Sequence, residues 1–147
     1  MAEGEILDVL MVEDNPADAE LTIQALRSDG LAPTVQVLRD GAEALDFLAG
    51  TGAFAGRDLG LKPRVILLDL KLPKVDGLEV LERLKSDPRT AVIPVVILTS
   101  SREERDLRDS YRLGANSYIV KPVDFEKFTE AVRQVGLYWL RLNQLPR

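Results

Sequence analysis

Polar and charged residues stand where four apolar segments of this chain stop. They are Glu13 and Asp14 after the first segment, then Asp69, Thr99 and Lys121 after three later ones. Carboxylates that converge repel one another unless a cation compensates their charge, and Mg²⁺ prefers such oxygen ligands. A carboxylate can also attack phosphorus and form an acyl phosphate when a metal ion and an ammonium or hydroxyl group hold the phosphoryl oxygens. The set therefore predicts magnesium-dependent phosphoryl transfer.

Each residue type matches one need of that chemistry. Asp69 is the candidate nucleophile and phosphoacceptor, Glu13 and Asp14 are the candidate metal acids, Thr99 donates a hydroxyl, and Lys121 supplies the cation. Taken alone, each has an ordinary structural explanation, such as a turn residue, a strand-end cap or a solvated loop lysine. It would be a rare coincidence for all of these residues to stand at successive strand ends of one α/β pattern. Their joint occurrence therefore favours a functional site.

The convergence of these residues depends on the elements that carry them. Five apolar runs alternate with helical segments, and most are rich in Val, Ile and Leu, as strands buried on both faces are. The runs cover residues 8–12, 34–38, 64–68, 95–98 and 118–120. Five β-α units predict an α/β fold, a doubly wound five-stranded parallel sheet with five helices. With the strand order 2-1-3-4-5, strands one and three are neighbours where the order reverses, and ligands bind at that point.

The helical segments have recognisable starts and stops. The first three are predicted over residues 16–29, 41–48 and 77–87, with Asn15 capping the first and Asp40 capping the second. Ser101 and Glu104 have capping-box spacing at the start of the fourth helix, which is expected to stop at Gly114. This fourth helix is rich in charge and poor in apolar residues, so we expect it to be thinly anchored and easy to shift.

The composition narrows the classes of function. The 147 residues are 46% hydrophobic and 29% charged, which suits one domain over residues 1–147, with an extended C-terminal helix and short tail from about residue 136. A net charge of −5 argues against general nucleic-acid binding, and no apolar run is long enough to span a membrane. The chain has no cysteine and no histidine, which excludes disulfides, thiol nucleophiles and histidine bases. With no signal peptide at the N-terminus, the protein is expected to be cytoplasmic.

One connection, residues 49–63, is unusually long and rich in glycine. Loops of that length are usually functional or mobile. A tolerated surface insertion and a partner-binding role both remain open for it.

The last helix, from about residue 125 to residue 142, carries an apolar stripe. Its members are spaced three and four residues apart: Phe125, Phe128, Val132, Val135, Trp139 and Leu142. The first half is expected to pack on the sheet. The second half, with Leu137 and Leu140 beside it, is expected to overhang, because the helix is about 28 Å long and a strand only about 17–20 Å. We therefore predict a two-fold homodimer whose interface includes Tyr138, Trp139 and Leu142. Alternatively, the helix breaks at Gly136.

Several motifs together resemble the receiver domains of response regulators in two-component signalling. They are Val-Glu-Asp-Asn-Pro-Ala-Asp (12–18), Leu-Leu-Asp-Leu-Lys-Leu-Pro (67–73), Asp-Gly (76–77), Ile-Leu-Thr-Ser (97–100), Gly-Ala (114–115) and Tyr-Ile-Val-Lys-Pro (118–122). The motifs stand in the family's order and cover nearly the whole chain. The resemblance implies the flavodoxin-like form of the doubly wound fold.

The resemblance also implies roles for the acidic residues. In that family the aspartate at the end of the third strand accepts a phosphoryl group from the phosphohistidine of a sensor kinase, and Asp69 holds this position. Glu13 and Asp14 match the family's Mg²⁺ site, which Asp69 and the backbone carbonyl of Lys71 would complete. The protein would then be a phosphoacceptor that assists its own phosphorylation and dephosphorylation rather than an enzyme with turnover.

A conformational switch is a further implication. Thr99 and Lys121 match the family's switch hydroxyl and lysine, and Tyr118 matches the aromatic residue whose rotamer follows the switch. Only residues 143–147 follow the fifth helix. The output is therefore expected to be a protein–protein contact or onward phosphotransfer.

The pattern further resembles the single-domain regulators that partner bacterial phytochromes. The similarity lies in residues 14–18, the long loop after Leu48, residues 110–116 and the aromatic C-terminal helix. The resemblance implies a bacteriophytochrome as the sensor histidine kinase. Lys71 departs from the pattern, because asparagine is expected there, and its side chain places a second cation near the site.

Three other functions account for parts of the sequence. A Mg²⁺-dependent phosphohydrolase of the haloacid-dehalogenase type also uses a strand-end aspartate, but it typically has a second acid two residues later, where this chain has Lys71. A flavodoxin-like cofactor binder needs a phosphate loop after the first strand, and Glu13 and Asp14 would repel a phosphate there. The third is a pseudo-receiver that only binds partners. A phosphorylation assay distinguishes it from a receiver that accepts a phosphoryl group.

Overall fold

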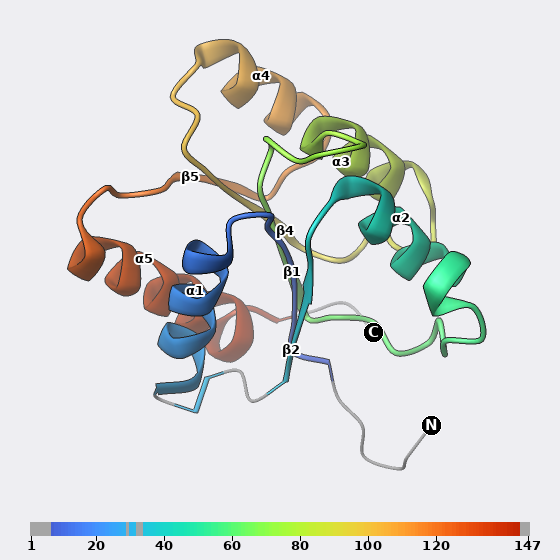
Figure 1. Ribbon diagram of the computed structural model, residues 1–147, viewed down its shortest axis with the longest axis horizontal. Coiled ribbons are helices and arrows are strands. Elements are labelled where there is room, and N and C mark those ends of the chain that lie inside the picture. The colour runs from blue at the N-terminus through green and yellow to red at the C-terminus, as the bar shows by residue number, and fades with distance from the viewer. Residues whose placement is uncertain (1–6, 29, 32–33, 145–147) are drawn as a thin grey trace.

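The computed structural model describes residues 7–28, 30–31 and 34–144, and it shows a parallel sheet between layers of helices (Figure 1). The sheet has five strands in the order β2-β1-β3-β4-β5. Their bounds are β1 (Val9–Val12), β2 (Val35–Leu38), β3 (Val65–Leu68), β4 (Val95–Thr99) and β5 (Ser117–Val120). Each strand lies within one residue of its expected bounds. The predicted doubly wound, flavodoxin-like fold is confirmed.

Helices cover both faces of the sheet, which is why the central strands β1 and β3 are apolar and buried throughout. The five helices are α1 (Pro16–Ser28), α2 (Gly41–Ala49), α3 (Gly77–Ser86), α4 (Glu104–Arg112) and α5 (Phe125–Leu137). Side chains alternate along each strand, so Val9 and Val65 join the core under α1 and α5, whereas Leu10 and Ile66 join the core under α2 and α3. Figure 1 shows these two helix pairs on opposite sides of the sheet.

Four helices start at a side chain that caps their first turn. The Asn15 side-chain oxygen accepts hydrogen bonds from the backbone N–H groups of Ala17 and Asp18, at 2.9 and 3.1 Å. Three aspartates cap the N-termini of α2, α3 and α5 in the same way: Asp40, Asp76 and Asp124. The caps satisfy N–H groups that have no partner within the helix, so these starts follow from local chemistry.

Gly77 lets α3 begin directly against the end of β3. A methyl group on this glycine would lie 2.3 Å from the carbonyl oxygen of Asp69 and 2.5 Å from the Cα of Leu70. The Gly77 N–H also donates a hydrogen bond to the Leu70 carbonyl, at 2.9 Å. The backbone that leaves Asp69 is therefore fixed by a helix start that has no room for a side chain.

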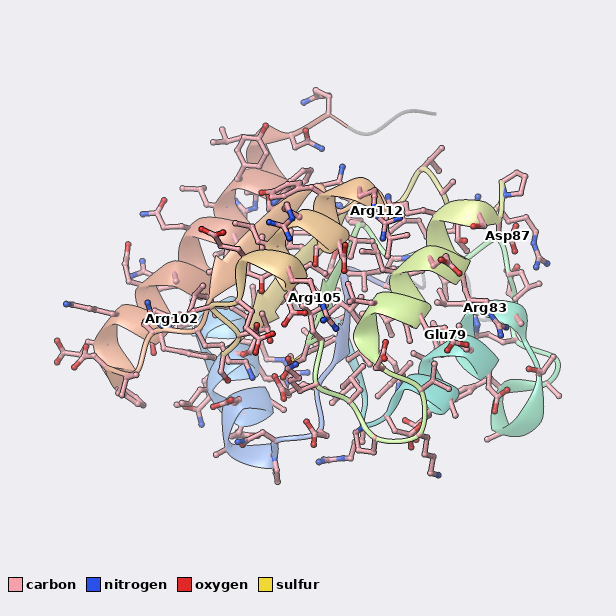
Figure 2. All side chains as sticks on the ribbon, turned by 90° about the horizontal axis from the view of Figure 1, so that it is seen from above. Glu79, Arg83, Asp87, Arg102, Arg105 and Arg112 are labelled. Atoms are coloured by element: carbon pink, nitrogen blue, oxygen red, sulfur yellow. The ribbon has the colours of Figure 1, made fainter. Side chains whose placement is uncertain are left out.

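The fourth helix differs from its sequence prediction. α4 begins at Glu104 and its cap position, Glu103, makes no side-chain capping bond, so the expected capping box of Ser101 and Glu104 is wrong. The Ser101 hydroxyl accepts a hydrogen bond from the N–H of Glu103 at 3.3 Å, ahead of the helix, and donates to the buried carboxylate of Asp106 at 2.5 Å. Seen from above, α4 lies between α3 and α5 (Figure 2).

The connection from residue 49 to residue 63 is an ordered structure built around Arg57. It contains the short helix η1 (Gly52–Phe54). The guanidinium group of Arg57 donates hydrogen bonds to the carbonyls of Phe47 and Leu61, at 2.7 and 3.1 Å, and lies 4.0 Å from the centre of the Phe47 ring. These contacts hold the loop against α2.

The last helix continues past Gly136 and widens into a π-helical turn, η2 (Tyr138–Leu142). The predicted break at Gly136 does not occur, because this glycine is the point at which α5 packs closely on Leu26 and Leu31. Leu140 was expected to overhang but is buried, since the π-helical turn rotates it toward the core under α1 and α5. No helix in the described ranges is long and apolar enough to cross a membrane.

Only some side chains of the apolar stripe of α5 are buried inside the protein. Phe128 and Val132 are buried as predicted, and Val135, in the second half of the stripe, is buried as well. Phe125 is 61% exposed, so its predicted packing on the sheet is wrong, because it is the first residue of α5 and the stripe has not yet reached the sheet.

Candidate functional site

The site lies where the strand order reverses. β1 and β3 are adjacent, and the N–H of Asp69, one residue past the end of β3, donates to the carbonyl of Val12 in β1 at 3.1 Å. The chain then leaves β1 toward α1 and β3 toward α3, on opposite faces of the sheet. Carboxylate oxygens of Glu13, Asp14 and Asp69 lie within 4.8 Å of one another in the opening between them. Glu13 and Asp69 are buried, and Asp14 is exposed.

Lys121 compensates this negative charge from the end of β5. Its ammonium nitrogen lies 2.7 Å from Glu13, 2.9 Å from Asp18 and 3.0 Å from Asp69. The N–H of Lys121 donates to the carbonyl of Thr99 at 2.8 Å, so the end of β4 fixes where this side chain starts. Three carboxylates therefore surround one buried cation.

Asp18 is a residue of this site that the strand-end argument did not identify. It lies in the first turn of α1, and its carboxylate is 2.9 Å from the ammonium group of Lys121. The available signal was weak: an acidic residue in a first helical turn is common for reasons of helix capping alone. Its partner lies 103 residues away in sequence, so only the tertiary fold reveals the pairing.

Burial and charge set the protonation of the two central groups. Burial raises the pKa of Glu13 to about 7, the hydrogen bond from Lys121 opposes this shift, and the charge of Asp69 adds to it. Burial alone would lower the pKa of Lys121, but its hydrogen bonds to Glu13 and Asp18 outweigh it and the pKa is raised. Lys121 is therefore a permanent cation, while Glu13 takes up a proton near neutral pH.

Thr99 and Tyr118 are both hydrogen-bonded to the backbone of Ser101. Thr99 is fully buried, and its hydroxyl oxygen accepts a hydrogen bond from the N–H of Ser101 at 3.4 Å. The Tyr118 hydroxyl donates to the carbonyl of Ser101 at 3.1 Å, and burial of its ring raises the pKa of this phenol. Ser101 thus connects the two residues that the sequence singled out for a switch.

Lys71 takes part in the site through its backbone, whereas its side chain points elsewhere. Its backbone N–H donates to the Asp69 carboxylate oxygen that does not bind Lys121, at 3.3 Å. The Lys71 backbone therefore lies against the candidate acceptor. Its ammonium group lies 3.6 Å from the carboxylate of Asp106 in α4. The side chain of Lys71 thus forms an ion pair with α4.

The donor set fits a small hard cation. Three carboxylates close together, with Asp14 open to solvent, offer oxygen ligands on one side and leave room for water on the other. A separate hollow of about 720 Å³ lies between α2 and α3, lined in part by Leu45, Leu48 and Val75, and none of these carboxylates lines it. The carboxylate cluster at the strand ends is therefore separate from this hollow.

Comparison with known proteins defines the class of protein that this fold and site represent. The family model of the response regulator receiver domain matches residues 9–133. The chain belongs to the response regulator receiver family. In two-component systems, receivers of this family take part in signalling with histidine kinases.

Similar proteins include regulators from different kinds of signalling. FilR2 of Methanothrix harundinacea, a probable methanogenesis regulatory protein, is 45% identical over 94% of this chain and 86% of its own length. Response regulator Rcp1 of Synechocystis, in a Mn²⁺-bound crystal structure, is 37% identical over 96% of this chain and 99% of the other, with a TM-score of 0.89. The bacteriophytochrome response regulator AtBRR is 54% identical over 95% of this chain and 99% of the other, with a TM-score of 0.73. These proteins resemble the chain over nearly its whole length.

Proposed function

We propose that this protein is a phosphorylation switch that accepts a phosphoryl group on Asp69 from the phosphohistidine of a sensor kinase. The observation that carries this proposal is the Asp69 carboxylate held 3.0 Å from the Lys121 ammonium group, beside the acids Glu13 and Asp14. An oxygen of Asp69 attacks phosphorus as the bond between phosphorus and the kinase histidine breaks. Lys121 and the Thr99 hydroxyl then hold the phosphoryl oxygens.

The proposed cofactor is Mg²⁺, held by Glu13, Asp14, Asp69 and the backbone carbonyl of Lys71. When bound, this ion neutralises the phosphoryl oxygens that approach Asp69. The close carboxylates support the assignment, as does the Mn²⁺-bound form of the similar regulator Rcp1.

The affinity for Mg²⁺ is expected to rise about tenfold between pH 6 and pH 8, because Glu13 must lose its proton before it can bind the ion. The sign follows from the pKa of Glu13, which is raised to about 7, so the group is mostly protonated at pH 6 and mostly ionised at pH 8. Isothermal titration calorimetry at several pH values measures the affinity. Glu13→Gln should bind Mg²⁺ more weakly and with a flat pH profile, and a flat profile in the wild type would refute this assignment.

Phosphotransfer from a kinase is the direct test of the function. Purified protein is mixed with a panel of autophosphorylated histidine kinases, and the rate of transfer is measured for each. We propose a bacteriophytochrome as the cognate kinase, on the basis of the similarity to AtBRR, and a cytoplasmic location for this protein. Preferential transfer from a kinase of another class would replace the phytochrome assignment without affecting the proposed acceptor.

The alternative functions are less consistent with the site. The phosphohydrolase reading needs a second acid two residues after Asp69, and that position is Lys71, whose ammonium group pairs with Asp106. A pseudo-receiver needs no acceptor chemistry, yet the carboxylates and Lys121 form a compact charged cluster. The output is proposed to be a protein–protein contact or onward phosphotransfer.

Phosphorylation is expected to draw the Thr99 hydroxyl toward the phosphoryl group and to let Tyr118 turn inward. The Ser101 backbone lies between these residues, so both changes should loosen the segment from residue 100 to residue 120. Hydrogen exchange with and without beryllofluoride, a phosphoryl mimic, measures this effect, with β1 as an internal reference. Unchanged exchange across this segment would contradict the switch.

We propose a homodimer in which the end of α5 and η2 form the interface. Tyr138 and Leu142 are 50% and 63% exposed, and the Tyr138 ring packs edge-on against Trp139. A few large apolar side chains of this kind, at roughly 1.5–3 kcal/mol each when fully buried, are sufficient for association. Sedimentation at micromolar concentration should give twice the monomer mass, and Trp139→Glu or Leu142→Glu should give the monomer. Val92→Glu, at an exposed apolar residue elsewhere, is the matched control.

A further inference from the structure

Helix α4 is held in place mainly by polar contacts. Its two buried residues are Asp106 and Ser110, and the Ser110 hydroxyl has no hydrogen-bond partner in the described part of the chain. Its apolar residues, Leu107 and Tyr111, are 40% and 50% exposed and face away from the core. Little apolar burial anchors this helix, so its position depends on the polar partners of its inner face.

A groove also separates α4 from α3. It is lined in part by Glu79 and Arg83 of α3 and by Arg112 of α4, all three of which are labelled in Figure 2. Most residues that line this groove are charged, and its two apolar ones are Leu78 of α3 and Leu113, which follows the last residue of α4. Apolar packing therefore reaches α4 at its C-terminal end and not at its first turn. The contacts of Asp106 therefore matter more for the position of α4 than a single acidic residue usually does.

Asp106 has one cationic partner in the described residues. The Lys71 ammonium group lies 3.6 Å from its carboxylate, and the Ser101 hydroxyl donates to the same oxygen at 2.5 Å. The Asp106 side chain is 9% exposed, whereas that of Lys71 is 67% exposed. The N-terminal end of α4 also favours a negative charge, but Lys71 supplies the full positive charge that a buried carboxylate needs.

Lys71 is also placed to respond to the phosphoryl group. It lies two residues after Asp69, and its N–H donates to the Asp69 carboxylate. Phosphorylation would replace one carboxylate charge by a group that carries about 1.5 to 2 negative charges near neutral pH. The Lys71–Asp106 pair is largely solvated on the lysine side, so a stronger anion nearby competes well for the ammonium group.

We infer that Lys71 and Asp106 form a latch: the ammonium group pairs with Asp106 in the unmodified protein, moves to the phosphoryl group on Asp69, and thereby releases α4. Asp106 is the positioning residue of this latch. Once Lys71 has left, the buried carboxylate of Asp106 lacks a cation. Asp106 then moves toward water together with the first turn of α4. The inference rests on the proposed function, because the competing anion is the phosphoryl group.

The test measures hydrogen exchange of α4 in the full chain, with and without Mg²⁺ and beryllofluoride. In the wild type, the mimic should speed exchange of α4 about tenfold. Lys71→Met should show fast α4 exchange already without the mimic, and the mimic should add little. Asp106→Asn keeps a hydrogen bond to Ser101 and needs no cation, so adding Lys71→Met to it should change nothing. Exchange of β1 and β3 reports whether each variant is folded.

Lys74→Met is the matched control. Lys74 lies in the same loop, is 69% exposed, and also holds a carboxylate at 3.6 Å, but that carboxylate belongs to Asp40 at the start of α2. This variant should behave like the wild type. Equal α4 exchange in Lys71→Met and Lys74→Met, or additive effects of Lys71→Met and Asp106→Asn, would overturn the latch. A wild type that takes up neither the mimic nor a phosphoryl group would instead overturn the proposed function.

Discussion

Asp69→Asn is expected to lose acyl phosphate formation almost completely, with a labelling rate below about one hundredth of the wild-type rate, because an amide is not a nucleophile toward phosphorus. Asparagine has nearly the same shape as aspartate, and its single amide oxygen can still accept the hydrogen bond from Lys121. The loss should therefore reflect chemistry rather than unfolding. The measurement is intact mass after incubation with Mg²⁺ and acetyl phosphate, where the wild type should gain one acid-stable, base-labile phosphoryl group.

The same variant also removes a candidate metal ligand, so a control must separate the two effects. Asp14→Asn removes a carboxylate from the metal site but leaves the acceptor intact. It should be labelled more slowly at low Mg²⁺ and recover at least in part as the Mg²⁺ concentration rises. Asp69→Asn should not recover at any Mg²⁺ concentration. Full labelling of Asp69→Asn at the wild-type rate would show that the acceptor is a different residue.

The second large effect is expected for Lys121→Met, which removes the cation that three carboxylates share. Glu13 and Asp69 are buried, so without Lys121 no side-chain cation compensates them, and Glu13 can escape the repulsion only by taking up a proton. In metal-free buffer we expect a loss of about 3–5 kcal/mol in the free energy of unfolding, the usual cost of leaving one partner of a buried ion pair alone. Saturating Mg²⁺ should restore part of it, because the ion binds the folded carboxylates and not the unfolded chain.

Urea unfolding with chelator and with Mg²⁺ measures this loss of stability. Lys127→Met is a suitable control, because this lysine lies in the first turn of α5 away from the carboxylates. Phosphorylation of Lys121→Met should also slow by about two orders of magnitude, as when one preorganised charge is removed from a transition state. If Lys121→Met were as stable as the wild type in chelator, the carboxylates would not depend on this lysine.

The sheet and the carboxylate cluster follow from the sequence for a common reason. Parallel strands share one carboxyl edge, so polar residues that end successive apolar runs must meet there. Glu13, Asp14, Asp69 and Lys121 are therefore expected to lie together. In the structure the three carboxylates lie within 4.8 Å of one another, and Lys121 lies 2.7 Å from Glu13. Their proposed roles in phosphoryl transfer remain predictions.

The rest of the site depends on pairings that no local pattern encodes. Ser101 has the spacing of a helix cap, yet its hydroxyl binds Asp106, because the fold offers it a buried carboxylate. Asp18 likewise looks like an ordinary first-turn acid until β5 brings Lys121 to it. Such choices are made by tertiary structure, which competes with local propensity and wins where a charge is buried.

The last helix, α5 with η2, also has contacts that its sequence pattern does not predict. The heptad-like spacing of α5 predicts a continuous stripe, but η2 changes the period of the helix and turns Leu140 inward. The Arg64 side chain, which also pairs with Asp8 at 3.6 Å, donates a hydrogen bond to the Leu140 carbonyl. The Arg141 guanidinium donates to the carbonyl of Gly30 at 3.1 Å. Neither contact is visible in the periodicity.

The close approach of α3 to the end of β3 has a consequence for how this protein tolerates genetic change. Any residue other than glycine at position 77 brings a Cβ to 2.3 Å from the Asp69 carbonyl, so the backbone beside the acceptor must shift. A neutral substitution at Gly77 is therefore ruled out by space alone, although this residue has no group that takes part in chemistry. In a population of homologous genes, position 77 would drift as little as the acceptor itself. Selection there would preserve an empty volume rather than a functional group.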